Sequence, residues 1–91
     1  MNKRFRIKVS GIVQGVFFRA TASNEAKKRS LTGWVQNESD GSVLIEVQGE
    51  DTSLEGFKEW CKKGPIAATV HHIAVKELGE NTNETDFVIR R

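Results

Sequence analysis

Two glycines and an arginine frame a short stretch near the start of the chain, Gly11–Arg19. Gly11 and Gly15 can adopt positive φ angles, so the backbone between them can curl and direct successive N–H groups toward one centre. Arg19 adds a planar guanidinium that is always charged and can bind two oxygens of a phosphate at once. These residue types at this spacing predict a site for a small oxyanion, held without a metal ion.

The segments on either side of this turn would position the site. Residues 5–9 alternate apolar and basic side chains, which is typical of a strand with one buried and one solvent-exposed face. Phe18, Ala22 and Ala26 recur every fourth residue and predict an amphipathic helix over residues 18–30. The free N–H groups at the start of that helix would add partial positive charge to the same place.

The rest of the chain predicts a second helix and more strands. Thr52–Glu55 has the hydroxyl and carboxylate spacing of a capping box, and Gly64–Pro65 would end the helix that starts there. Leu54, Phe57 and Cys61 would share its apolar face, with Trp60 beside them. The predicted strands are residues 34–37, 43–47, 70–78 and 87–89, with a turn at 38–41 that makes the first two a hairpin.

This order of elements, β-α-β-β-α-β plus a short C-terminal strand, predicts an α+β fold of the ferredoxin-like split βαβ type. In that arrangement two helices cover one face of an antiparallel sheet. A chain of 91 residues fits one small domain, so we expect residues 1–91 to form a single one.

Composition argues against several classes of function. The formal net charge is +2, and basic residues are interspersed with acidic ones, so no block of charge would follow a nucleic acid or a membrane surface. Cys61 is the only cysteine, which excludes an intrachain disulfide and suits a reducing compartment. No segment has the length of a membrane span or the pattern of a signal peptide. We therefore expect a cytoplasmic monomer.

Two motifs together resemble the acylphosphatase family. The stretch Gly11–Arg19 has the pattern G-x-V-Q-G-V-x-F-R, and Leu31–Asn37 reads L-T-G-W-V-Q-N. Supporting matches at Asp40–Val43, Gly64–Pro65 and Phe87–Ile89 extend the resemblance over nearly the whole chain. Ala20 and Thr21 depart from the pattern, because many relatives place aromatic residues after the arginine.

The resemblance implies hydrolysis of the carboxyl–phosphate bond of a small acyl phosphate, without a metal or an organic cofactor. It assigns phosphoryl binding to Arg19 and positioning of the attacking water to Asn37. The implied cradle consists of the backbone N–H groups of Gln14, Gly15, Val16, Phe17, Phe18 and Arg19. The loop carries no Asp, Glu or His as a general acid, which favours a carboxylate leaving group, whose conjugate acid has a pKa of about 4.

Several of these residues also have ordinary structural explanations. Phe17 and Phe18 are expected to pack in the core or at the rim, although one could line the mouth of the site. His71 and His72 are adjacent, so on a strand they face opposite sides and form a poor metal pair. Cys61 is expected in the core. Arg90–Arg91 could place its carboxylate near a basic group of the site, but a solvated tail is preferred.

Two other functions compete with hydrolysis. Ferredoxin-like sheets also bind anions or single-stranded RNA, but the strand over residues 42–47 lacks the aromatic side chains on which bases stack. The chain could instead be a detached relative of the acylphosphatase-like domain of larger carbamoyl-transfer enzymes. Because their metal-binding cysteines do not follow, a free-standing enzyme is preferred.

Overall fold

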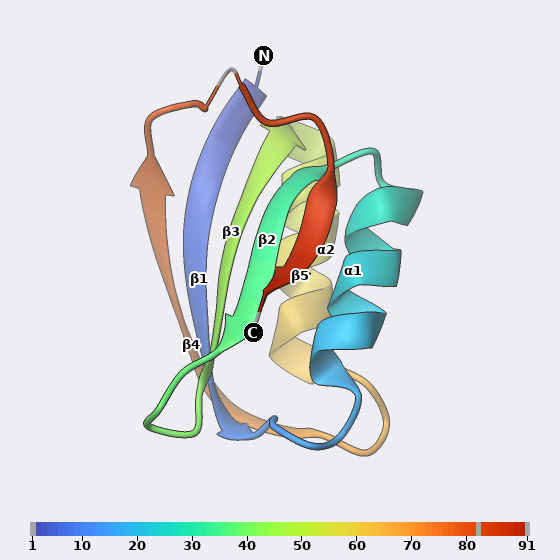
Figure 1. The fold of residues 1–91 in the computed structure, drawn as a ribbon, viewed down its shortest axis with the longest axis vertical. Coiled ribbons are helices and arrows are strands. Elements are labelled where there is room, and N and C mark those ends of the chain that lie inside the picture. The colour runs from blue at the N-terminus through green and yellow to red at the C-terminus, as the bar shows by residue number, and fades with distance from the viewer. Residues whose placement is uncertain (1, 82, 91) are drawn as a thin grey trace.

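The computed structural model describes residues 2–81 and 83–90, which form five strands and two helices (Figure 1). The elements are β1 (Asn2–Ile12), α1 (Phe18–Lys28), β2 (Thr32–Asn37), β3 (Val43–Glu50), α2 (Asp51–Lys63), β4 (Thr69–Leu78) and β5 (Phe87–Arg90). Their order and their type confirm the ferredoxin-like prediction. Over the described residues, no helix is both long enough and apolar enough to cross a membrane.

The five strands form one sheet in the order β4-β1-β3-β2-β5. Three of the four neighbouring pairs are antiparallel, but β5 runs parallel to β2, with Gly33 opposite Phe87. The prediction of a fully antiparallel sheet is therefore wrong at this edge. Figure 1 shows that β4 finishes at the same end of the sheet at which β2 starts. The connection after β4 crosses this end, so β5 starts there too and runs in the same direction as β2.

Both helices lie on one face of the sheet, and the core lies between the two layers (Figure 1). Alternating residues of the strands point into it and are fully buried, among them Ile7, Val9, Val35 and Ile45. The expected helix positions, Phe18, Ala22, Ala26, Leu54, Phe57 and Cys61, are also buried. The periodicity of the sequence thus predicted which side chains form the core.

The opposite face of the sheet is less exposed than the alternation of β1 suggests. Arg4 points to this face, yet only 3% of it is exposed. Its guanidinium binds Glu46 on β3 at 3.0 Å and Glu84, in the connection between β4 and β5, at 2.7 Å. Burial of a cation is tolerated here because both partners are carboxylates. This connection covers one end of the open face.

The ends of the helices differ in detail from the predictions. The prediction of a capping box at Thr52–Glu55 is wrong. The helix α2 already starts at Asp51, and its N-cap residue, Glu50, makes no side-chain capping bond. The strand β3 runs directly into α2, which leaves no turn in which a serine or threonine could cap. Gly64 does end α2, with φ of 70°, as predicted.

Candidate active site

The backbone between β1 and α1 has the alternating conformation that an anion cradle requires. Gly15 has φ of 72° and Phe17 has φ of 63°, while Val16 between them does not have a positive φ. Alternation of this kind turns successive N–H groups toward the same concave side. Among the described residues, the N–H groups of residues 14–19 donate no hydrogen bond to a backbone carbonyl.

The first turn of α1 extends this set of free donors. The helix begins at Phe18, and neither a capping side chain nor an acidic residue in the first turn satisfies its N–H groups. The helix dipole therefore adds partial positive charge at the concave side of the loop. The predicted N–H donors, from Gln14 through Arg19, therefore run from this loop into the first turn of α1.

Arg19 is held by the strand at the far edge of the sheet. Its Nη1 donates to the carbonyl oxygen of Arg90 at 3.1 Å. The Arg90 guanidinium in turn lies over the ring of Trp34 on β2, 4.4 Å from the ring centroid, in a cation–π contact. The position of the Arg19 side chain therefore depends on how β5 is docked on β2.

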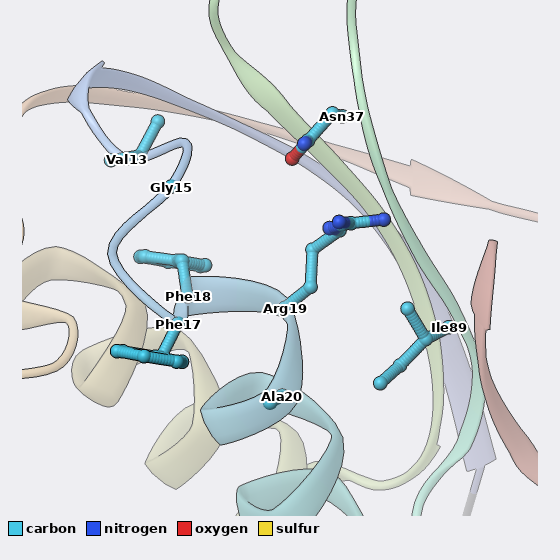
Figure 2. Close-up of a pocket in the computed structure, with 8 residues that line it drawn as sticks. All are labelled: Val13, Gly15, Phe17, Phe18, Arg19, Ala20, Asn37 and Ile89. Carbon is cyan, nitrogen blue, oxygen red and sulfur yellow. The ribbon is translucent and has the colours of Figure 1, made fainter. Parts of the chain in front are cut away.

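Asn37 is the last residue of β2 and pairs with Val43 across the hairpin. Its Oδ1 is buried and has no hydrogen-bond partner among the described residues. Figure 2 shows that its carboxamide and the Arg19 guanidinium extend toward the same space, from β2 and α1 respectively. A buried acceptor without a partner is unusual, since most such atoms are satisfied in folded proteins.

The side chain of Gln14 joins the cradle loop to the hairpin. Its Nε2 donates to the carbonyl oxygens of Glu38 and Ser42, both at 2.8 Å. These two residues bracket the turn that follows Asn37. Sequence reasoning assigned only the backbone of Gln14 to the site and missed this bridge, because its acceptors are backbone atoms 24 and 28 residues away.

The same turn is braced from its other side by Asp40. This carboxylate binds Lys8 on β1 at 2.8 Å, and its Oδ1 accepts bonds from the backbone N–H and the hydroxyl of Ser42. The bonds to Lys8 and Ser42 hold the pKa of Asp40 well below its usual range. The hairpin that carries Asn37 is thus fixed to both β1 and the cradle loop.

These elements enclose an open cavity of about 280 Å³ (Figure 2). It is lined by Val13, Gly15, Phe17, Phe18, Arg19, Ala20, Asn37 and Ile89. Arg19 and Asn37, which are 18 positions apart in sequence, meet here. Within the described residues, the lining includes no Asp, Glu or His that could serve as a general acid or base.

Other residues singled out from the sequence lie elsewhere. Cys61 is fully buried on α2, where burial raises the pKa of its thiol. His71 and His72 are exposed on β4, and the part of the chain that the structure describes holds no group of three possible metal ligands. The prediction of a solvated tail is wrong for Arg90, which belongs to β5, while Arg91 lies outside the described residues.

Comparisons with known proteins agree with the resemblance. A family model described as Acylphosphatase matches residues 5–89. A protein named Acylphosphatase from Marinobacter nauticus is 44% identical over 84 residues, which are 92% of this chain and 91% of that protein. One from Oceanobacillus iheyensis is 44% identical over 89 residues, or 97% of this chain and 98% of that protein.

Solved structures give the same result. The crystal structure of acylphosphatase from Bacillus subtilis superposes with a TM-score of 0.93 at 40% identity and covers all of both chains. Full-length HypF in a phosphate- and nucleotide-bound form matches this chain with a TM-score of 0.86 at 33% identity, but over only 12% of its own length. The chain therefore belongs to the acylphosphatase family and is a hydrolase of acyl phosphates.

Proposed function

We propose that this acylphosphatase holds the phosphoryl group of its substrate in the N–H groups of residues 14–19, beside the Arg19 guanidinium. Asn37 orients the water that attacks phosphorus. The P–O bond to the acyl group breaks, which yields a carboxylate and inorganic phosphate. The observation that carries this proposal is the meeting of three kinds of group around a single cavity. They are one guanidinium, backbone donors and a carboxamide oxygen, and the last two have no hydrogen-bond partner in residues 2–81 and 83–90.

The chemistry explains why so few groups suffice. A carboxylate leaves without being protonated, because its conjugate acid has a pKa of about 4. Phosphoryl transfer depends mainly on positioning and on stabilisation of charge at the equatorial oxygens, which N–H donors and a guanidinium supply. The proton of the attacking water goes to an oxygen of the substrate phosphate, because the cavity lining that the structure describes offers no side-chain base.

The unpartnered oxygen of Asn37 supports its assignment. A water between this Oδ1 and the phosphoryl group would donate one hydrogen bond to the carboxamide oxygen and keep a lone pair directed at phosphorus. The buried acceptor would then be satisfied in the substrate complex. The unsatisfied acceptor lowers the stability of the free enzyme, and the hydrogen bond that satisfies it forms only when substrate and water are bound.

The competing function, binding of an anion or RNA on the open face of the sheet, is not favoured. Trp34 is on this face, but the Arg90 guanidinium already covers its ring. Arg4 and Arg6 on the same face are paired with Glu46. Retention of RNA at physiological salt by the intact protein would instead support a nucleic-acid function.

We further propose that residues 1–91 act as one domain, as a monomer in the cytoplasm, without a metal or a nucleic-acid partner. One hydrophobic core cluster supports the single domain, and the balanced charge supports the absence of a nucleic-acid partner. Gel filtration tests the monomer. Unchanged activity in EDTA is expected, and a loss that Mg²⁺ reverses would contradict the metal-free mechanism.

The test of the mechanism is Arg19→Gln with benzoyl phosphate as substrate. This variant should lose both turnover and competitive inhibition by inorganic phosphate, with a decrease in kcat/KM of at least about 10²–10³. Arg6→Gln is a matched control, because it removes the same charge from the opposite face of the sheet. Circular dichroism establishes that both variants are folded, and a folded Arg19→Gln enzyme with full activity would refute the assignment.

A further inference from the structure

The cavity beside Arg19 has a rim of apolar side chains, whereas the proposed cradle uses backbone N–H groups and the Arg19 guanidinium. Five of its eight lining residues are apolar, namely Val13, Phe17, Phe18, Ala20 and Ile89. Phe18 is only 1% exposed and belongs to the core, whereas Phe17 is 80% exposed and Ile89 is 47% exposed. Figure 2 shows the two phenylalanines on one side of Arg19 and Ile89 on the other. The rim therefore presents apolar surface on both sides of the guanidinium.

Neither backbone geometry nor packing explains a phenylalanine at position 17. The residue is in the left-handed region, with φ of 63° and ψ of 20°, which is unfavourable for any side chain with a Cβ and is easily adopted by glycine. Its ring is largely exposed, so it contributes little to the core. Strained backbone tends to cluster at ligand sites, and this strained residue lines the cavity.

The charges around the cavity limit what the rest of the substrate can be. Among the described residues that line the cavity, Arg19 is the only charged one, and Asn37 has the only other polar side chain. Both are engaged at the phosphoryl end in the proposed function. An acyl group with a second phosphate or carboxylate would find no further cation among these described residues, while an apolar group would find Phe17 and Ile89.

We propose that the preferred substrates are acyl phosphates whose acyl group is apolar, aromatic or branched, and that this group packs against Phe17 and Ile89. The inference rests on the proposed function, since the position of the phosphoryl group determines where the acyl group leaves the cradle. The side chains of Phe17 and Ile89 then determine specificity, while only the backbone N–H of Phe17 belongs to the phosphoryl cradle.

The test compares kcat/KM for benzoyl phosphate, acetyl phosphate and 1,3-bisphosphoglycerate, whose acyl group carries a second phosphate. The wild-type enzyme should prefer benzoyl phosphate. Phe17→Ser and Ile89→Ser should each reduce the benzoyl-to-acetyl ratio by roughly 3- to 10-fold, the range expected for loss of an apolar or aromatic contact. Ile66→Ser is the control, because Ile66 is fully exposed but does not line the cavity.

A ratio of two substrates on one preparation is independent of the fraction of folded enzyme, so a destabilised variant cannot imitate the effect. Phosphate release with an unchanged ratio in both rim variants would overturn this inference alone. A wild-type preference for 1,3-bisphosphoglycerate would do the same. If the wild-type enzyme released phosphate from none of the three compounds, the proposed function would fail, and this inference with it.

Discussion

Truncation of Asn37 to alanine should separate the activity of this enzyme from its stability. The buried Oδ1 has no partner among the described residues, and an unsatisfied buried acceptor costs about 1–3 kcal/mol. Asn37→Ala removes that cost and loses some packing of the side chain. We therefore expect the free energy of unfolding to stay the same or to rise by about 1 kcal/mol.

The same substitution should lower kcat by about 10²–10³, which corresponds to about 2.7–4 kcal/mol of transition-state stabilisation. The inhibition constant of inorganic phosphate should change little, because the cradle and Arg19 remain. The substitution should thus lower kcat without lowering the free energy of unfolding.

Urea unfolding gives the free energy of unfolding, and steady-state kinetics on benzoyl phosphate with phosphate as inhibitor give kcat and the inhibition constant. Gln36→Ala is the matched control: it truncates an adjacent carboxamide that does bind a partner, Glu38, at 2.7 Å. It should lose a little stability and keep its activity. If Asn37→Ala instead lost stability in step with activity, Asn37 would be structural, and if it kept its kcat, the orientation of water would be the wrong explanation.

Three further predictions concern the frame of the site. Gln14→Glu replaces a donor to two carbonyl oxygens by a carboxylate, so it should cost about 1–3 kcal/mol in urea unfolding and lower kcat. Gly33→Ala should prevent folding, as seen by circular dichroism, because the added Cβ would lie 1.9 Å from the carbonyl oxygen of Glu46. Gly41→Ala is the control and should fold, because Gly41 also has a positive φ but faces open space. Burial alone would raise the pKa of Glu46, but bonds to two arginines of β1 lower this pKa below its ordinary value of 4.5. The ionised carboxylate therefore stabilises the fold above about pH 4.5, and this stabilisation is lost as the pH falls through the lowered pKa. Glu46→Gln should therefore flatten the dependence of unfolding free energy on pH in that acid range, and an unchanged slope would contradict this account.

Much of the fold could be predicted from local patterns. Alternation in residues 5–9 and the fourfold spacing of Phe18, Ala22 and Ala26 correctly predicted which side chains are buried, because burial on one face follows directly from the period of a strand or helix. Glycine at position 15 likewise predicted the left-handed backbone of the cradle loop. These features depend on neighbours a few residues away, so the sequence contains them locally.

What the sequence did not reveal depends on partners that are distant in the chain. The Gln14 bridge, the Arg19 bond to Arg90 and the burial of Arg4 all involve partners at least 24 residues away. Polar side chains have no periodic pattern that identifies such a partner. The parallel pairing of β5 was missed for a related reason, since it follows from where β4 ends in space and not from the residues of β5 themselves.

Two unfavourable features of this structure lie at one cavity. Phe17 has a left-handed backbone, and the buried acceptor of Asn37 has no partner in the described part of the chain, whereas the apolar side chains of the core are packed and buried. Ser30, which also has a positive φ, follows the end of α1 and lies outside this cavity. Natural sequences tend to be locally consistent except where function requires otherwise. Both unfavourable groups face the space where the phosphoryl group, its water and the acyl group are proposed to lie. A bound substrate would therefore offset unfavourable free energy that is present in the free enzyme. The packing of the two helices and five strands provides enough stability to tolerate it.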